Sequence, residues 1–311
     1  MQQRSFTFQS EDGTEIYVYH WSPEAETPIR GVVQIAHGMA ETAARYEGFA
    51  RALTEAGYGV YANDHRGHGK TAGKVEHVGY LADNDGFRWL VEDVHKLGGI
   101  IRGENPALPL FLFGHSMGSF AAQRYIMLYG RELRGVILSG SDGSKSGLLF
   151  AAGRWLAQQE IKKKGRRAKS ERLNKMSFGG YNKAFRPNRT EFDWLSRDEK
   201  EVDKYIADPY CGTVFSCGFF DDFLAGMQQL HNKQELLQIP KELPIYIFSG
   251  DKDPVGKNGK GVLQLMNKYR QLGLEDVSMK LYKEGRHEML NEINREEVMT
   301  DVIAWLEKHN N

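Results

Sequence analysis

A serine, a histidine and two aspartates occupy positions from which they could form a nucleophilic site. Residues 110–119 read LFLFGHSMGS, so Ser116 follows a strongly apolar run and has a glycine two positions away on each side. A serine hydroxyl becomes a useful nucleophile when a neighbouring base takes its proton. A carboxylate then orients the basic imidazole and stabilises its protonated form. No lysine follows the glycines, so the pattern favours acyl transfer over the binding of a phosphate.

The candidate acid and base both follow the serine along the chain. Where a Gly-x-Ser-x-Gly turn joins a strand to a helix, the expected order is serine, acid, histidine. His287 lies in the loop after the last expected strand, and Asp251 and Asp253 follow an earlier strand within SGDKDPV. We expect His287 to be the base and Asp253 to be the acid, because Asp253 lies deeper in its loop and Pro254 fixes the turn. Asp251 is the alternative acid, and is otherwise a turn or capping residue.

Two backbone amides are needed to hold the oxyanion that forms during acyl transfer. The amide of Met117 is one candidate, because it directly follows the nucleophile and lies at the start of a helix. Gly38 allows the loop after GVVQIA to turn tightly, which leaves the amide of Met39 as the second donor. His37 is then expected to be a structural hydrogen-bonding residue.

His65 and His68 suggest a metal site at first, since two imidazoles lie three residues apart. No third ligand has a helpful spacing and the stretch is rich in glycine, so we interpret it as a structural turn beside the serine. The two cysteines, Cys211 and Cys217, lack the spacing of a metal-binding pair and are too few to staple a chain of this length. We therefore expect neither a metal nor another cofactor.

The elements that must position these residues alternate between strand and helix. Two antiparallel strands are expected in the first thirty residues, and β-branched or apolar runs then alternate with helical patterns. Such runs are typical of strands that are covered on both faces. The rhythm predicts an α/β fold with an eight-stranded, mostly parallel sheet and helices on both faces. Further strands are expected at 31–36, 57–64, 108–114, 134–140, 244–253 and 277–285, and helices at 43–56, 84–102, 117–129, 258–272 and 294–309.

The alternation stops after the sixth expected strand. We expect residues 143–242 to form a helical cap, inserted into a core made by residues 1–142 and 243–311. Residues 145–190 hold 13 Lys+Arg against 2 Asp+Glu, and residues 191–222 hold 3 against 9, which favours solvated helix faces that attract one another. The alternative is that the basic stretch KKKGRRAK (162–169) contacts anionic lipid. The stretch VFSCGFFDDFLAGM is the candidate acyl-binding wall, although core packing explains the same residues equally well. Its aromatic side chains are Phe215, Phe219, Phe220 and Phe223.

Composition and charge are those of a packed globular chain. Of 311 residues 41% are apolar, and Lys+Arg and Asp+Glu both total 41. The formal net charge of zero gives no indication of a nucleic-acid partner. The first residues lack the apolar run of a secretion signal, and no stretch approaches the ~18 apolar residues that would span a bilayer. We expect a cytoplasmic protein, with peripheral membrane contact through the basic cap segment as a further hypothesis; the oligomeric state cannot be predicted.

Together these residues resemble the α/β-hydrolase fold, and more narrowly its monoacylglycerol lipase and lysophospholipase branch. That branch has an HG-x-x-E…RY segment, a D-x-RGHG turn, a GHSMG elbow, a G-x-x-D acid and a late histidine. The resemblance covers essentially the whole core, and the G-x-x-D match supports Asp253 as the acid. The matching segments here are His37 to Glu41 with Arg45-Tyr46, Asp64 to Gly69, Gly114 to Gly118, Gly250 to Asp253, and Gly285 to Glu288.

The resemblance implies a serine hydrolase of carboxylic esters. A monoacylglycerol or a lysophospholipid is the leading expectation for the substrate, because FDWLSRDEKEVDKYIADPYCG also resembles the caps of bacterial lysophospholipase-like members. Three alternatives stay open: an esterase of small non-lipid esters, an aminopeptidase or amidase, and a non-catalytic binding protein on the same fold. For the amide-cleaving alternative, Asp221 and Asp222 are the residues that could hold a substrate amine.

Overall fold

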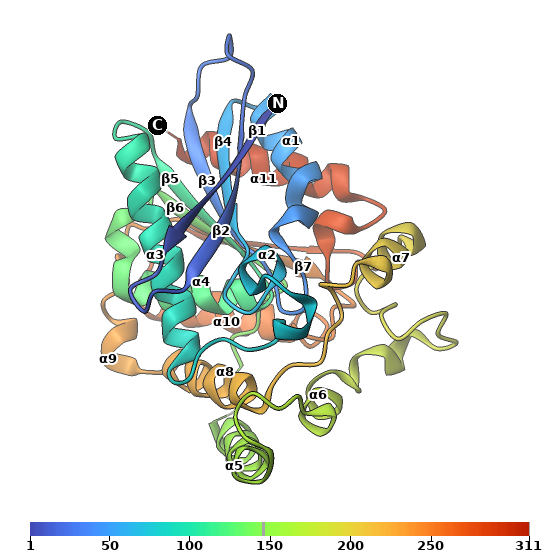
Figure 1. Cartoon of the computed structure of the whole chain (residues 1–311). Coiled ribbons are helices and arrows are strands. Elements are labelled where there is room, and N and C mark those ends of the chain that lie inside the picture. The colour runs from blue at the N-terminus through green and yellow to red at the C-terminus, as the bar shows by residue number, and fades with distance from the viewer. Residues whose placement is uncertain (145–146, 311) are drawn as a thin grey trace.

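A mixed sheet with helices on both faces makes up the core of the computed structural model, which describes residues 1–144 and 147–310 (Figure 1). Within these residues eight strands pair in the order β1-β2-β4-β3-β5-β6-β7-β8. The edge strands β1 and β2 are antiparallel, β2 is antiparallel to β4, and all the other neighbours are parallel. The predicted eight-stranded, mostly parallel sheet is therefore confirmed. The strands are β1 (Gln2–Gln9), β2 (Glu15–Ser22), β3 (Gly31–Ala36), β4 (Tyr58–Asn63), β5 (Leu110–His115), β6 (Gly135–Ser139), β7 (Ile245–Gly250) and β8 (Val277–Tyr282).

The central strands are buried along their whole length. Every residue of β3 to β7 is buried, whereas most of β1 is exposed at the edge of the sheet. Runs such as GVVQIA and YGVYAN place apolar side chains on both faces, which is stable only when helices cover both. The sequence pattern of these strands thus follows directly from their position in the middle of three layers.

Helices pack on each face of the sheet. On one face, α1 (Glu47–Glu55) and α11 (Arg295–His309) bury Leu53 and Val302 in one core cluster. On the other, α3 (Gly86–Glu104), α4 (Met117–Tyr129) and α10 (Lys260–Gln271) bury a second cluster. Short helices lie in the loops: η1 (Ala43–Tyr46), α2 (Gly69–Ala72), η2 (Val75–His77), η3 (Gly130–Glu132) and η5 (Met289–Asn291).

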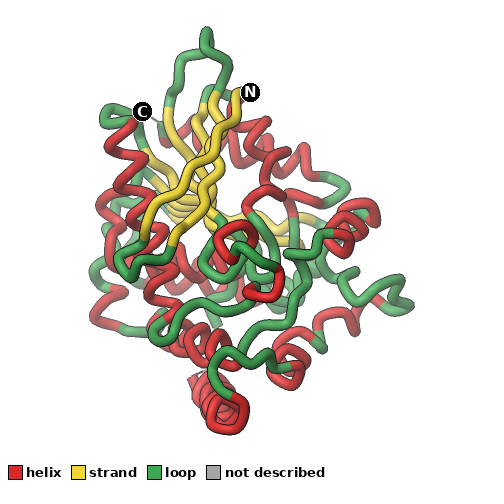
Figure 2. Tube along the Cα trace, viewed as in Figure 1, coloured by secondary structure: helices red, strands yellow, loops and turns green. Residues whose placement is uncertain are grey.

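The chain between β6 and β7 forms the cap. It contains helices joined by loops, drawn red and green in Figure 2, below and beside the carboxyl ends of the strands. A helical cap after the sixth strand is thus confirmed. Its helices are α5 (Gly147–Lys164), α6 (Glu171–Phe178), η4 (Tyr181–Phe185), α7 (Glu199–Ala207), α8 (Cys217–Gln229) and α9 (Lys233–Leu236).

Helix α8 is fixed on the core by close approaches of its backbone. A Cβ placed on Gly226 would lie 2.1 Å from the Phe87 ring of α3, and one on Gly86 would lie 2.7 Å from Asp222 Oδ2. The amide of Ser216, just before α8, donates to the carbonyl of Gly79 at 2.9 Å. Glycine is required where two helices approach this closely, so the α3–α8 contact is part of the core packing.

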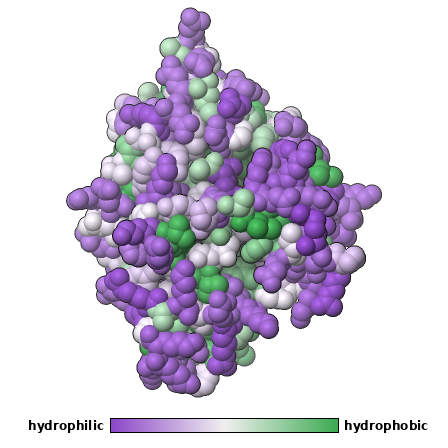
Figure 3. Space-filling view, turned by 45° about the vertical axis from the view of Figure 1, so that its right-hand side comes forward, coloured by the Kyte–Doolittle hydropathy of each residue, from purple (hydrophilic) through white to green (hydrophobic). Residues whose placement is uncertain are grey.

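The surface is mostly hydrophilic on the face shown in Figure 3, and apolar residues gather near its middle. The outer cap helix α5 is an exception to the usual burial, because Leu148, Leu149 and Trp155 are 91%, 71% and 60% exposed. Among the described residues, no helix combines the length and apolar character needed to cross a membrane.

Candidate active site

Ser116 occupies a strained turn between β5 and α4. Its φ of 51° and ψ of −118° lie outside the regions that most side chains adopt, and such strain is typical of functional positions. The two flanking glycines explain how the turn is possible. A Cβ on Gly114 would lie 2.5 Å from the carbonyl oxygen of Gly118, and one on Gly118 would lie 2.0 Å from that of Ala36. Any larger residue at either position would push Ser116 out of its place.

Asp253 and His287 form a buried pair at the carboxyl ends of β7 and β8. His287 Nδ1 lies 2.9 Å from Asp253 Oδ1, which also accepts the amide of Val255 at 2.9 Å. The hydroxyl of Ser249 donates to the other carboxylate oxygen at 2.7 Å. Asp251 instead accepts the amide of Glu284 at 2.8 Å in a surface turn. Of the two candidate acids, the structure brings Asp253 to the histidine.

The pair is arranged to keep charge on the carboxylate. Burial raises the pKa of Asp253, but the charge and hydrogen bond of His287 outweigh this, so the pKa lies below its ordinary value. Burial lowers the pKa of His287, and the charge and hydrogen bond of Asp253 more than compensate, so that pKa lies above its ordinary value. Nδ1–H therefore donates to Asp253, which leaves Nε2 free to accept a proton.

Ser116 lies beside the same loops as His287. Among the described residues, no hydrogen bond joins the Ser116 hydroxyl to the imidazole, and such bonds are often long before substrate is bound. The ring of His115, next to the serine, lies 4.8 Å from that of His287, centroid to centroid. Gly140 has a φ of +57°, and a Cβ on it would lie 2.8 Å from His287 Cε1. The absence of a side chain at Gly140 therefore leaves room for the imidazole of His287.

The loop after β3 lies against the serine, as an oxyanion loop requires. A Cβ on Gly38 would lie 3.2 Å from Ser116 Cβ, and Ala40 has a φ of 59° in the same turn. Met39 stands between these two residues. Met117 is the first residue of α4, so its N–H has no partner within the helix. Both candidate amides therefore belong to backbone that turns around Ser116.

Three histidines form a buried, neutral cluster behind this loop. His37 Nδ1 lies 2.7 Å from the carbonyl of Gly38, and its Nε2 accepts the amide of His65 at 2.9 Å. Burial lowers the pKa of His65 to about 3 and that of His68 to about 4. His37 thus joins the loop after β3 to the turn at His65 by hydrogen bonds. The described part of the chain contains no group of three or more His, Cys, Asp or Glu side chains that could hold a metal ion.

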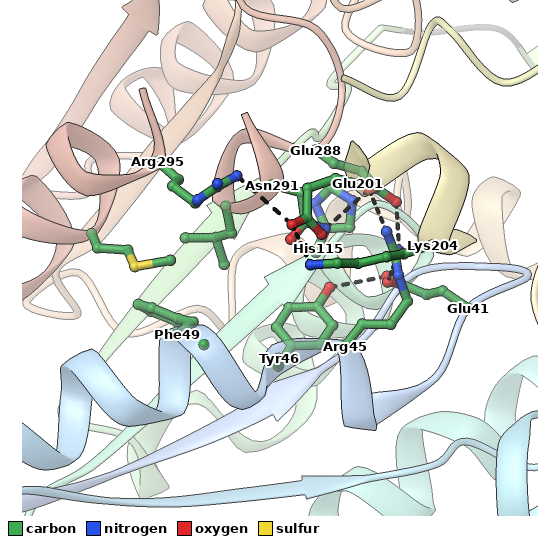
Figure 4. A pocket seen from close by; sticks show the side chains of 13 residues that line it. Glu41, Arg45, Tyr46, Phe49, His115, Glu201, Lys204, Glu288, Asn291 and Arg295 are labelled. Atoms are coloured by element: carbon green, nitrogen blue, oxygen red, sulfur yellow. Dashed lines mark hydrogen bonds and ion pairs between the residues drawn. The ribbon is translucent and has the colours of Figure 1, made fainter. Parts of the chain in front are cut away.

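A charged cluster that had no assigned role in the sequence lies next to the pair. Arg45 Nη1 donates to Glu41 at 2.7 Å, and its two terminal nitrogens each donate to Glu288 at 2.6 Å. Figure 4 shows these side chains converging beside His115, at one side of a cavity of about 190 Å³. Glu41 and Arg45 both belong to the HG-x-x-E…RY segment, and Glu288 directly follows His287. These two features are the sequence signals from which the cluster could have been predicted.

The cap is bonded to the loop that carries the histidine. The amide of His287 donates to the carbonyl of Trp194 at 3.3 Å, and the amide of Glu288 to that of Leu195 at 2.7 Å. The guanidinium of Arg286 donates to the carbonyl of Ser196 at 3.1 Å, and the rings of Trp194 and His287 lie 5.1 Å apart. Residues 194–196 of the cap thus form part of the wall around the candidate base.

The four predicted acyl-wall residues are largely interior. Phe215, Phe219 and Phe220 are buried, and Phe223 is half-buried against the rings of Phe87 and Phe120. These aromatic residues belong to the same apolar cluster as Met117, and Met39 packs against that cluster. Core packing accounts for these contacts, and the cavity described above is lined by other residues.

Other charged residues of the cap are paired. Asp222 accepts from Arg166 at 2.7 Å, and Asp221 accepts from Arg154 at 3.1 Å. Arg167 lies 3.2 Å from Asp83 on the core. In the basic stretch 162–169, Arg166 is thus paired with a buried carboxylate of the cap, whereas Arg167, Lys162 and Lys163 are exposed.

Comparisons with known proteins agree on one group of enzymes. Residues 27–294 match the model of a family described as serine aminopeptidase, S33. A monoacylglycerol lipase of Mycolicibacterium smegmatis is 31% identical over 313 residues, which cover 97% of this chain and 96% of the relative. A monoglyceride lipase of Mus musculus is 26% identical over 303 residues, covering 95% and 88%. A carboxyl esterase of Bacillus coagulans, solved in complex with glycerol, superposes with a TM-score of 0.91 at 30% identity, covering 100% of both chains.

Proposed function

Because the chain belongs to the serine aminopeptidase, S33 family and to the monoacylglycerol lipase-like branch of the α/β-hydrolases, we propose that it hydrolyses monoacylglycerols through a Ser116–His287–Asp253 triad. The chain is a serine ester hydrolase; the triad and the lipid substrate are the proposed part. The observation that carries the proposal is the buried 2.9 Å contact between Asp253 and His287 beside the strained turn of Ser116.

The reaction proceeds in two halves. Ser116 Oγ attacks the ester carbonyl carbon while His287 Nε2 takes its proton, and Asp253 stabilises the imidazolium. The amides of Met39 and Met117 donate to the oxyanion, which develops in the transition state and is complete in the tetrahedral adduct but is absent from the bound ester. The tetrahedral adduct collapses as His287 protonates the departing alcohol. Water, deprotonated by the same imidazole, then releases the fatty acid from Ser116.

Replacement of the nucleophile tests the mechanism. Ser116→Ala should abolish hydrolysis of p-nitrophenyl esters and labelling by a serine-directed phosphonate, since no other group can form the acyl-enzyme. Monoacylglycerols, lysophospholipids and p-nitrophenyl esters of several chain lengths should be compared on the native chain. A Ser116→Ala variant that stays active would refute the triad, whereas a preference for lysophospholipid or short esters would refute only the substrate.

The pairing in the cap weighs against amide cleavage. An aminopeptidase needs a free carboxylate to bind the substrate amine, and the two candidates, Asp221 and Asp222, each accept from an arginine instead. A guanidinium that is paired with a carboxylate offsets its negative charge and occupies acceptor positions that a substrate amine would need. We therefore expect aminoacyl p-nitroanilides to be hydrolysed far more slowly than p-nitrophenyl esters; equal rates would contradict this expectation.

We also propose that the cap spans residues 143–242 and that its outer helix contacts anionic membranes. Leu148, Trp155 and Lys162 are seven residues apart on α5, so they share one face. An exposed stripe of apolar and basic residues is typical of helices that lie in a membrane interface. The aromatic side chains of α8, Phe219 and Phe223, are proposed to line the path of the acyl chain.

Charge reversal at one lysine tests the membrane contact. Lys162→Glu should weaken binding to phosphatidylserine vesicles severalfold, because each basic residue near the surface contributes about 1 kcal/mol. Lys96→Glu, on the exposed side of α3, changes the net charge equally and should have little effect. Binding that is indifferent to salt, or that falls equally in both variants, would contradict the proposal.

A further inference from the structure

Arg45 is the centre of the charged cluster beside the candidate site. Its side chain is 12% exposed, and its guanidinium makes three charge-assisted hydrogen bonds of 2.6 to 2.7 Å to two carboxylates. The pair with Glu288 is bidentate, a geometry that fixes orientation as well as distance. The ring of Tyr205 from the cap covers the guanidinium at 4.9 Å. Arg45 is therefore held in one position from several sides.

The first carboxylate belongs to the turn that carries Met39. Glu41 Oε1 accepts the backbone N–H of Gly38 at 2.5 Å and the hydroxyl of Tyr46 at 2.9 Å. A side chain that bonds back to an amide three residues earlier fixes the turn between them. The direction of the Met39 amide therefore depends on where Arg45 holds Glu41.

The second carboxylate belongs to the loop that carries His287. Glu288 is the next residue, and its backbone amide donates to the cap at Leu195. Its side chain is held by Arg45 and by Asn291 at 3.0 Å. The two loops are separated by 243 positions in the sequence, and one guanidinium joins them.

We propose that Arg45 is a positioning residue, which sets the distance between the oxyanion turn and the general base by clamping Glu41 to Glu288. The inference rests on the proposed triad. Neither Arg45 nor its partners act on the substrate; they hold the Met39 amide and the imidazole in register. A displacement of about 1 Å in such a constellation can lower the rate about 10²-fold.

The electrostatics of the cluster support a role beyond stability. Burial raises the pKa of Glu41. The charge of Arg45 lowers this pKa and the charge of Glu288 raises it further, so the pKa of Glu41 lies above its ordinary value. Burial acts the same way on Glu288, but the charge and hydrogen bonds of Arg45 dominate and the pKa of Glu288 lies well below its ordinary value. Well-packed apolar residues can often replace such a buried cluster without loss of stability, so stability alone does not explain why this site is charged.

Conservative replacement of the clamp provides the test. Arg45→Lys keeps the positive charge but cannot bond two carboxylates in a fixed plane, and Arg45→Met removes the charge as well. We expect kcat for p-nitrophenyl esters to fall about 10-fold in Arg45→Lys and about 10²-fold in Arg45→Met, with KM within about twofold of the native value. The rate of phosphonate labelling should fall in parallel, because that reaction uses the same oxyanion amides.

Arg124 offers a matched control. It forms a bidentate pair with Glu235, at 2.6 and 2.8 Å, and is also 12% exposed, but it lies between α4 and α9. Arg124→Lys also breaks a bidentate pair, so it should lower thermal stability but leave kcat unchanged. Rates are expressed per folded molecule, measured by circular dichroism, and Arg45→Lys decides the question where Arg45→Met does not fold.

The outcomes separate the two proposals. An Arg45→Lys variant with native kcat, or an equal loss of kcat in Arg124→Lys, would overturn the positioning role while Ser116→Ala remains inactive. A rise in KM without a fall in kcat would also overturn it, since that pattern indicates loss of substrate binding. An active Ser116→Ala variant would instead refute the triad on which the inference rests.

Discussion

The two aspartates after β7 allow the proposed acid to be tested against a neighbour two residues away. In Asp253→Asn, the amide NH₂ would face His287, so the imidazole would have to present an unprotonated Nδ1 and carry its proton on Nε2. That tautomer cannot accept the proton of Ser116. The same change in the serine-protease triad lowers kcat about 10⁴-fold, which at about 1.36 kcal/mol per decade is about 5 kcal/mol of transition-state stabilisation.

The structure predicts a much smaller effect at Asp251. Its carboxylate accepts one backbone amide, from Glu284, and lies 3.9 Å from Lys252 near the surface. An asparagine side chain can still accept that hydrogen bond, so Asp251→Asn should change the free energy of unfolding by about 0.5 kcal/mol or less and keep kcat within about twofold. Asp253→Asn should also destabilise the fold, by about 1–3 kcal/mol, because a buried acceptor of three donors is altered.

Hydrolysis of a p-nitrophenyl ester by both variants is the assay, with the folded fraction measured by circular dichroism. Loss of folding and loss of catalysis are then separated. The assignment would be refuted by an Asp253→Asn variant that keeps more than about a tenth of the native kcat, or by a greater loss in Asp251→Asn.

The pKa of His287 leads to two further predictions, and the turn around Ser116 leads to a third. Because that pKa is raised, the base is neutral only above the ordinary range near 6.5, so kcat/KM should rise with pH through an acid limb above about 6.5; a limb well below it would contradict the assignment. The raised pKa of His287 also stabilises the folded state. This stabilisation is complete at a pH below the pKa of the unfolded chain and is lost as the pH rises through the pKa of the folded state. The melting temperature should therefore fall across that pH range. Gly118→Ala should lower the free energy of unfolding by about 3 kcal/mol, since its Cβ would meet Ala36 O at 2.0 Å. Gly48→Ala, on α1 with open space around it, should raise the unfolding free energy by up to about 1 kcal/mol; equal effects in urea denaturation would refute the steric explanation.

Much of the core could be predicted because its signals are local. The run GVVQIA is β3 from first to last residue, and the helix expected at 117–129 is α4. Continuous burial and helical periodicity are properties of neighbouring residues, so the sequence displays them directly. The helix expected at 43–56 is instead η1 followed by α1, because the backbone of Tyr46 (φ −89°, ψ 4°) leaves the α-helical region at their junction.

The missed features depend on contacts between distant segments. Arg45 belongs to the HG-x-x-E…RY segment, but its role cannot be predicted until the fold brings Glu288 beside it. The uneven charge of the insertion predicted helix faces that attract one another, and Arg166 does pair with Asp222. Composition cannot reveal which residues pair, or that Arg167 reaches Asp83 on the core. The roles proposed for Ser116 and the oxyanion amides stay predictions, and the structure adds the geometry that makes them testable.

The hydrogen bonds between residues 194–196 and the loop of His287 have a consequence for protein engineering. Caps are often exchanged between relatives to transfer substrate preference. Here a graft of the whole insert would also replace the backbone acceptors at Trp194 and Leu195, and with them the support of the base. A chimera that exchanges α5 and α6 but keeps residues 191–198 from this chain should retain turnover. A chimera that exchanges residues 191–198 as well should need new contacts to support the loop of His287. For recombination, the boundary of the catalytic unit therefore lies inside the cap.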